Sequence, residues 1–466
     1  MKREKPRRII CIICICQLLI MAMAAGCGKK KVDYSLNEPT NTGGSVNKSD
    51  DADLKRTLNV PDSCNETIIE VSDEAVIDYS MINCENIEVP DVSSMDIVHY
   101  DKYNVTPEVK KSFAEALFEK DKGIYKYDYD NPTKADLQKE IDRIEALLNQ
   151  NKIASVDDQG RIEELNQRLD EFNRAYDKAP EKYHEADNYE DTTYIGTAND
   201  EEYMFSMGES DSYIWLDFYN RDILKLRPND EAEACSLGTD HLIDDPEPRE
   251  NTSEMNAEEA CSIAGDFLEQ IGFDDVICTQ IADLDWLYTK YDGRSVATET
   301  EGYSVKFARS IGGAPANDDE YLSLQTLNKA GYYSGLPAES FEVNVYKEKV
   351  ISMHLCLWCG TRLDVEKNVK LLTFDEIIEK AKMHFPEYYE KYPTEYDVDV
   401  FSKAKLTYML MSDGKNQYKY VPVWAFSESY EFRDYDGSIS YYTFQLILMD
   451  ATTGEIIDYV EERNKF

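Results

Sequence analysis

The sequence is poor in positive charge. Its 466 residues include 92 Asp and Glu against 50 Lys and Arg, which gives a formal net charge of −42 at pH 7. Proteins bind nucleic acids and anionic lipid surfaces through clusters of Lys and Arg. This chain is therefore not expected to bind nucleic acid, and its folded part is not expected to lie on a negatively charged membrane. An acidic surface favours solubility and attracts cations or basic partners.

The sequence also lacks the short motifs of common catalytic sites. It has no glycine-rich phosphate loop, because Gly312-Gly313 is isolated and indicates a turn. The pair His184-Glu185 begins like a zinc-protease helix, but Asn188 stands where the second histidine would be. No Gly-x-Ser-x-Gly elbow is present. We therefore assign no catalytic, cofactor-binding or metal-binding residue from the sequence, and we expect no cofactor.

Cysteine is present but does not define a disulfide framework. Of the 11 cysteines, Cys11, Cys14 and Cys16 lie in the N-terminal 26 residues. Apart from Cys27, the others are scattered along the chain: Cys64, Cys84, Cys235, Cys261, Cys278, Cys356 and Cys359. An odd and widely scattered set indicates mostly buried thiols rather than a set of bridges.

The spacing Cys356-Leu-Trp-Cys359 is the one arrangement that could carry chemistry. A redox pair needs its first thiol at a helix N-terminus, whereas the alternation of apolar residues over 350–357 predicts a strand. On that strand His354 and Cys356 share a face, and Cys359 falls on the opposite one. A packing or structural role is favoured. The alternatives are a redox pair, or half of a metal site formed by His354 and Cys356.

A second short pattern resembles the start of a calcium loop. Asp434 and Asp436, which are followed by Gly437, have the spacing of its first two acidic ligands. Residues 438–442 supply no further acidic ligand and no closing Glu. An Asp-Gly pair between two strand-like runs is a strong hairpin signal. We interpret this stretch as a turn.

The first 27 residues have the features of a secretory signal. A basic head is followed by the uncharged run 9–25 and by the small residues Ala24-Ala25-Gly26 before Cys27. The run is interrupted by Gln17 and is shorter than the ~20 residues of a membrane-spanning helix. The end of the segment resembles the lipobox of bacterial lipoproteins. The resemblance implies removal of residues 1–26 and anchoring on the extracytoplasmic face of the cell membrane by a lipid on Cys27; an uncleaved membrane anchor is the alternative.

The next segments differ in composition. Residues 27–60 are polar and low in apolar side chains, so they predict a flexible acidic tether. Residues 61–250 predict an N-terminal α+β region that contains an inserted helical hairpin at 133–177. In that hairpin, apolar residues recur with heptad-like 3-4 spacing in two segments joined by a short polar connection. Each segment is too short to be stable alone, so we expect two antiparallel helices that pack on each other and on their neighbours.

The C-terminal part predicts two similar α+β units, 251–365 and 366–466. Asn256 with Glu259, and Thr373 with Glu376, each have the spacing of a capping box at a helix start. In both units the helix is followed by strand-like segments, the last two of them separated by a tight turn. A helix followed by an antiparallel meander buries its apolar stripe on one face of the sheet.

The second unit resembles a known family. The segments Tyr420-Val-Pro-Val-Trp-Ala-Phe426, Asp436-Gly437 and Leu448-Met-Asp-Ala-Thr-Thr-Gly-Glu-Ile-Ile457 are similar to those of PepSY-type domains. The resemblance implies an extracytoplasmic module that often binds or restrains another protein and has no catalytic residues. The whole chain also resembles uncharacterised lipoproteins of Gram-positive gut anaerobes, which implies a compartment only.

These features favour a lipid-anchored binding or regulatory protein without catalysis of its own. Its expected partner is another envelope protein or a component of the cell wall. One alternative is an extracytoplasmic hydrolase with a carboxylate-based site. A solute-binding lipoprotein is less favoured, because the βαβ alternation of that class is missing.

The anchor can be tested by one substitution. Cys27→Ser removes the only thiol next to the small-residue site, so it should abolish acyl labelling and release the protein from the membrane fraction. Fractionation and labelling with a palmitate analogue measure both. If the variant stays on the membrane at the wild-type level, residues 9–25 are themselves the anchor.

Overall fold

The computed structural model describes most of the chain after residue 52. The described ranges are 53–70, 79–149, 158–210, 213–226, 232–238, 250–290, 295–317, 336–391, 398–414, 416–433, 439–458, 461–462 and 464–465. In these ranges the protein is an α+β protein rich in antiparallel strands, which confirms the predicted class. None of the helices described is long and apolar enough to span a membrane.

The helices are distributed along the whole described chain. They are α2 (Leu54–Thr57), α3 (Pro107–Leu117), the 3-10 helix η1 (Lys120–Lys122), α4 (Lys134–Asn149), α5 (Asp158–Tyr176), α6 (Ile223–Leu226), α7 (Ala257–Gln270) and α8 (Phe374–Lys391).

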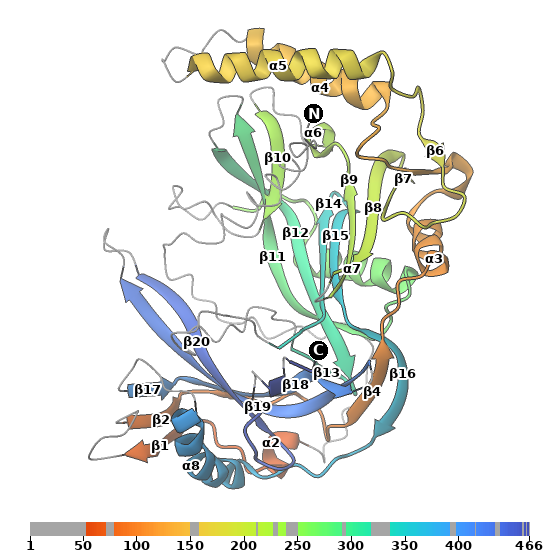
Figure 1. Ribbon diagram of the computed structural model, residues 1–466. Coiled ribbons are helices and arrows are strands. Elements are labelled where there is room, and N and C mark those ends of the chain that lie inside the picture. The colour runs from red at the N-terminus through yellow and green to blue at the C-terminus, as the bar shows by residue number, and fades with distance from the viewer. Residues whose placement is uncertain are drawn as a thin grey trace, which may run out of the picture.

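An 11-stranded sheet, here called the large sheet, forms the upper half of the molecule (Figure 1). Its paired strands are antiparallel. In spatial order they are β10 (Ala232–Gly238), β11 (Val276–Lys290), β12 (Ser295–Ile311), β14 (Ser340–Tyr346), β15 (Lys349–Leu357), β9 (Ile214–Asn220), β8 (Glu201–Glu209), β7 (Thr193–Ala198), β5 (Ile124–Lys126) and β6 (His184–Glu185), with β13 (Ala314–Pro315) beside β12.

A six-stranded sheet and a three-stranded sheet form the lower half. The six-stranded sheet has the order β16 (Cys359–Glu366), β4 (Ile97–Lys102), β19 (Gln417–Arg433), β18 (Lys403–Gly414) and β3 (Ile87–Glu88), with β20 (Ile439–Asp450) also on β19. The small sheet contains β1 (Cys64–Glu70), β2 (Tyr79–Cys84) and β17 (Val398–Phe401). Every sheet combines strands from more than one predicted region, and the division into domains stays a prediction.

Helices α7 and α3 cover one face of the large sheet. The predicted capping box of α7 is present: the Glu259 N–H donates to Asn256 Oδ1 at 3.0 Å, and the Asn256 N–H donates to Glu259 Oε2 at 2.9 Å. Thr106 caps α3, which starts at Pro107. The apolar stripes of both helices belong to one buried cluster with the inward side chains of β8, β9, β12, β14 and β15. Burial of this apolar area is the main source of stability in this half.

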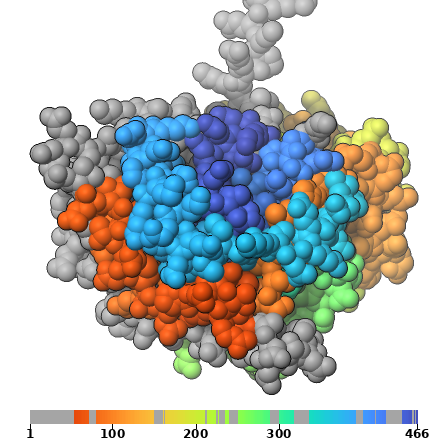
Figure 2. Space-filling model, turned by 90° about the horizontal axis from the view of Figure 1, so that it is seen from below, coloured from red at the N-terminus to blue at the C-terminus, as the bar shows by residue number. Residues whose placement is uncertain are grey.

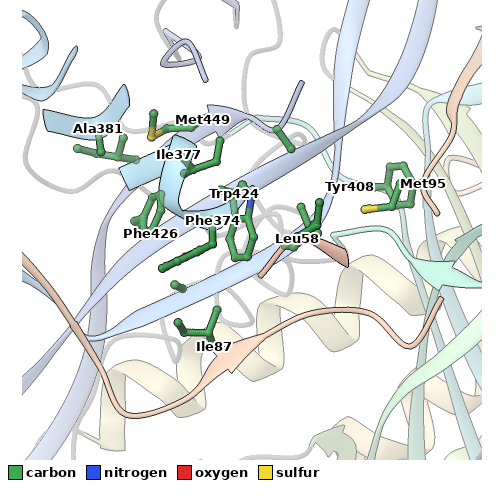
Figure 3. Close-up of a cluster of buried hydrophobic side chains, with 14 of the residues drawn as sticks. Leu58, Ile87, Met95, Phe374, Ile377, Ala381, Tyr408, Trp424, Phe426 and Met449 are labelled. Carbon is green, nitrogen blue, oxygen red and sulfur yellow. The ribbon is translucent and has the colours of Figure 1, made fainter. Parts of the chain in front are cut away.

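Helix α8 packs its apolar residues on the six-stranded sheet. Its predicted capping box joins Thr373 and Glu376. The rings of Phe374 and Trp424 meet edge to face, with centroids 5.1 Å apart. Figure 3 shows the surrounding cluster, which includes Leu58, Ile87, Ile377, Ala381, Phe426 and Met449.

The segment around α2 completes this core from the N-terminal side. The Phe374 N–H donates to the Leu58 carbonyl at 2.9 Å. From below, Figure 2 shows these orange-red residues beside the light-blue residues of α8. The first described residues are thus part of the C-terminal core.

Pro422 marks a change of neighbour along β19. Residues 417–420 of this strand pair with β4, whereas β20 pairs with it from Val423 onward. Proline has no N–H to donate to a ladder and is found where pairing is interrupted. Pro422 therefore lies between the two neighbours, in the segment that resembles a PepSY domain.

The predicted helical hairpin is present as α4 and α5, which lie side by side (Figure 1). Their contact buries Ile144, Leu147 and Leu165. The Lys134 ammonium group, at the start of α4, is 5.7 Å from the ring centroid of Tyr176 at the end of α5. The helices are therefore antiparallel.

The two predicted tight turns that the structure describes are present, but the strand expected after the second turn is not. Lys347 and Glu348 have positive φ angles between β14 and β15, and Gly454 has φ +73° after β20. The strand expected over residues 455–460 is not formed at 455–458, the part of it that the structure describes. There Ile456 makes an isolated bridge to Met449, because the chain turns back after Asp450.

A buried ion pair lies where the chain passes from the large sheet to the six-stranded sheet. Arg309 on β12 donates from Nε to Glu339 Oε2 at 2.5 Å, and both side chains are at most 5% exposed. Glu339 also accepts the Tyr420 hydroxyl at 3.0 Å. Its other oxygen, Oε1, accepts the N–H groups of Trp358 and Cys359, each at 2.9 Å. Every oxygen of this buried carboxylate is thus hydrogen-bonded.

Removal of one partner of this pair should be costly. Glu339→Gln leaves the Arg309 guanidinium buried opposite a neutral group, so the free energy of unfolding in urea should fall by about 3–5 kcal/mol. Asp275→Asn is the matched control, because Asp275 contacts the same guanidinium but is 41% exposed; it should cost about 0–1 kcal/mol. Equal effects of the two variants would show that the buried pair contributes no more to stability than the exposed one.

Candidate functional site

The face of the large sheet opposite α7, here called the outer face, carries polar and aromatic side chains. Strand β9 shows the division most clearly. Its residues Ile214, Leu216 and Phe218 are at most 1% exposed and pack in the core with α7. Trp215 and the two alternate residues after it, Asp217 and Tyr219, point the other way and are partly exposed. The sequence alternation predicted the buried side of this strand and left the other side without a role.

A row of polar residues crosses the outer face from strand to strand. Strand register places each of them directly opposite the next, and we call this set the polar row: Lys306, Glu342, His354, Asp217, Ser206 and Thr193. His354 Nδ1 lies 2.6 Å from Asp217 Oδ1. The Ser206 hydroxyl donates to Thr193 Oγ1 at 3.2 Å. Lys306, Glu342, His354 and Asp217 therefore offer donors, acceptors and both charge signs along one line, whereas Ser206 and Thr193 are buried at its end.

Trp215 forms an aromatic platform beside the polar row. It pairs with Cys356 on β15 and with Gly208 on β8. A Cβ atom built on Gly208 would lie 2.6 Å from Trp215 Cζ2. The indole therefore lies over Gly208, in space that only glycine leaves open.

An arginine-centred cluster closes the other end of β9. Arg221 donates from Nη2 to Asp136 Oδ1 at 2.9 Å, and from Nη1 to the Tyr183 oxygen at 2.8 Å and to Glu202 Oε1 at 2.5 Å. Its guanidinium lies 5.1 Å from the ring centroid of Tyr127. Asp136 belongs to α4, so this cluster fixes the helical hairpin next to the outer face.

Electrostatics explain why this cluster is stable although it is largely buried. Burial alone would raise the pKa of Asp136, but hydrogen bonds from Tyr183, Arg221 and Thr133 outweigh it and hold that pKa below its usual value. Burial and the same carboxylate raise the pKa of Tyr183. The Asp136 carboxylate is thus charged and the Tyr183 phenol neutral near pH 7.

The Cys356-Leu-Trp-Cys359 segment is a crossover between sheets. Cys356 ends β15 of the large sheet, and Cys359 begins β16 of the six-stranded sheet. The two cysteines are not bonded to each other, and each is at most 2% exposed. Burial raises the pKa of Cys359 well above its usual value, which opposes formation of a thiolate. These findings agree with the packing role and not with a catalytic redox pair.

The histidines do not converge on one place. His184 lies on the exposed strand β6, not on a helix, and His241 is in a part of the chain outside the described ranges. His99 lies between two carboxylates: its Nδ1 is 2.7 Å from Asp413 and its Nε2 is 3.0 Å from Glu366. Burial lowers the pKa of His99, but these two hydrogen bonds outweigh it and raise the pKa.

Two other sequence predictions fall where the structure gives no description, and one set of residues was not predicted. Cys27 precedes the first described residue, and residues 434–438 lie outside the described ranges, although β19 and β20 pair as the hairpin requires up to Arg433 and Ile439.

Within the described ranges no group of three or more His, Cys, Asp or Glu side chains could hold a metal ion. No sequence pattern indicated the polar row or Arg221. The signal that could have indicated Trp215 is its place in the alternation of β9.

Comparison with known proteins gives little information on function. No protein-family model matches the chain, and no curated protein matches it. Among solved structures, the chain is similar to an uncharacterized protein from Eubacterium rectale ATCC 33656, with 14% identity and a TM-score of 0.35. The match covers 87% of this chain and 99% of that protein.

We expect the contact between Asp136 and Arg221 to lose its contribution to stability in acid. Asp136→Asn should lower the free energy of unfolding at pH 7 by about 1–3 kcal/mol, since it removes hydrogen bonds to a charged acceptor. A pKa lowered by folding stabilises the protein above the unfolded value of about 3.9, and this contribution is lost as the pH falls through the folded pKa. The effect should therefore shrink toward pH 3. Denaturant titrations at several pH values measure it.

Asp142→Asn provides the control, because Asp142 is an exposed carboxylate on the same helix. It should change stability by less than about 0.5 kcal/mol at every pH. A pH-independent loss for Asp136→Asn would contradict the assigned role of its charge.

Proposed function

We propose that this protein is a lipid-anchored, extracytoplasmic binding protein that holds a polysaccharide of the cell wall on its outer face. The observation that carries the proposal is the polar row next to the Trp215 platform. The proposal includes no catalysis. It develops the expectation from the sequence that the partner is a wall component or an envelope protein.

The chemistry of the outer face supports a sugar ligand. A sugar ring has an apolar C–H face that packs on an indole, and hydroxyl groups that both donate and accept hydrogen bonds. Trp215 supplies the flat apolar surface. Asp217 and Glu342 supply acceptors, and His354 and Lys306 supply donors at fixed positions on rigid strands. Binding sites commonly combine an aromatic surface with a few polar groups that fix orientation.

The proposed location follows from the N-terminal sequence. A lipid on Cys27 and the acidic tether 27–60 would place the folded body on the outer side of the cell membrane. The strongly acidic composition supports attachment through lipid rather than through direct contact with anionic headgroups. A wall polysaccharide is then within reach of the outer face.

We also infer that the C-terminal part contains two related helix-and-meander units, the second of them PepSY-like. The support is a common order of elements. Helix α7 is followed by β11, β12, β14 and β15, and α8 is followed after the short β17 by β18, β19 and β20. Alignment of the two capping boxes also matches Ala264 with Ala381 and Leu268 with Phe385, and these four residues are fully buried.

The second candidate is an extracytoplasmic hydrolase. The short contact between His354 and Asp217 favours it, because a carboxylate that orients an imidazole is part of many general-base sites. This candidate differs from the first in one measurable way. It requires cleavage of the polysaccharide that is lost in Asp217→Asn while the polysaccharide is still bound.

The binding proposal is tested by sedimentation with purified peptidoglycan sacculi. Trp215→Ala should weaken binding by about 2 kcal/mol, or ~30-fold, as expected for a central aromatic contact. Gly208→Ala should also weaken it, because the new methyl group displaces the indole. Leu363→Ala, which removes a 49% exposed side chain from β16, serves as the control and should bind normally. Normal binding by both outer-face variants, or capture only by an envelope protein, would contradict the proposal.

A further inference from the structure

The fold brings cysteines together that are far apart in the sequence. Cys64 and Cys84 are direct cross-strand partners at the open ends of β1 and β2. The thiols of Cys261 on α7 and Cys278 on β11 are close enough to shift each other's pKa, and both lie at the edge of the same buried cluster. The scattered positions gave no sign of either pair, because one pair depends on strand register and the other on helix packing.

The first pair has the geometry of a cross-strand bridge. Directly opposite residues in an antiparallel ladder have Cα atoms about 4.5–5.5 Å apart and Cβ atoms at a similar distance. Disulfides need Cα atoms 4.4–6.8 Å apart. Cys64 and Cys84 are 7% and 1% exposed. The Cα spacing of this register therefore fits a disulfide, and the Cys84 thiol, which donates to the Phe401 carbonyl at 3.4 Å, has to turn toward Cys64 to form it.

The second pair links a helix to the sheet that it covers. Both residues are partly exposed and lie at the edge of the buried cluster between α7 and the large sheet. Helix α7 contacts β11 directly. Rotation about the side-chain bonds can bring two neighbouring thiols at such a helix–strand contact within bonding distance.

We propose that Cys64–Cys84 and Cys261–Cys278 are two disulfide cross-links of the mature protein. The oxidant is a small-molecule or protein disulfide. A thiolate of the pair attacks one sulfur of that disulfide and expels the other as a thiolate. The second cysteine then attacks the mixed disulfide and expels the remaining oxidant thiolate. Two cysteine thiols are oxidised to one disulfide, and one oxidant disulfide is reduced to two thiols.

The two pairs differ in when they can react. The neighbouring Cys278 thiol lowers the pKa of Cys261, so this partly exposed thiol can start the exchange in the folded protein. Burial raises the pKa of Cys64 to about 11 and that of Cys84 to about 12. The Cys64–Cys84 bridge therefore has to form during folding, before the strands close over it.

The other cysteines of the described chain are placed differently. Cys356 and Cys359 belong to different sheets, and Cys359 is buried beside Glu339. Cys235 lies on β10. We expect all three to remain thiols. The proposal goes beyond the binding function and does not depend on it.

The test uses the full chain in detergent, oxidised by glutathione disulfide either after folding or during refolding from urea. The protein is then denatured, labelled with N-ethylmaleimide without reduction and mapped by mass spectrometry. Oxidation of the folded protein should link Cys261 to Cys278 only. Refolding with the oxidant should link both pairs and leave Cys235, Cys356 and Cys359 labelled.

Two single substitutions keep the result clear. Cys261→Ser should leave Cys278 labelled and the Cys64–Cys84 link intact, and Cys356→Ser should leave both links intact. A native circular dichroism spectrum with Cys64 and Cys84 still labelled after oxidative refolding would overturn the first bridge. Glutathione attached to Cys261 without a link to Cys278 would overturn the second.

Discussion

The buried ion pair between Arg309 and Glu339 is the contact on which the arrangement of the two larger sheets depends. Two charges taken out of water are stable only if they face each other and their remaining hydrogen-bonding atoms are satisfied. The partners that achieve this come from both halves: Arg309 from the large sheet, Tyr420 from the six-stranded sheet, and Trp358 and Cys359 from the crossover. A shift of one sheet against the other would break the hydrogen bond from the Tyr420 hydroxyl to the Glu339 carboxylate.

This junction also explains the segment that looked most like a chemical site. The N–H groups of Trp358 and Cys359 both point at one oxygen of Glu339. The two-residue spacing between Cys356 and Cys359 is therefore the length of a crossover, and the thiols fill buried space at its two ends. Only the spacing of the two cysteines resembles a redox motif. They lie where β15 is followed by β16, and not at the N-terminus of a helix.

The outer face owes its polarity to what covers the other side. On β9 and β14, helices α7 and α3 bury the apolar half of the alternating residues, and the second half stays partly exposed to solvent or a ligand. On β9 this second half includes Trp215 and Asp217. Flat, rigid strands hold such groups at fixed spacing, and this is what recognition of a repeating polymer requires. The hairpin α4–α5, attached through Arg221, borders the same face.

The sequence by itself determined the features that depend on neighbours along the chain. Capping boxes at Asn256 and Thr373, the heptads of the hairpin and the tight turns were all predicted, because each is an interaction over three or four residues. The location at the membrane also rests on local sequence and stays a prediction. The strand expected after Gly454 was predicted wrongly, because the chain turns back after Asp450.

The tertiary structure alone decided which residues meet across sheets. The polar row, the Arg309–Glu339 pair and the two cysteine pairs each join residues from strands or helices that are distant in sequence. Their partners are set by strand register and by how α7 and the sheets pack, and a shift of one residue would turn every side chain of a strand to the other face. No local pattern contains that information, so the candidate site became visible only in the folded protein.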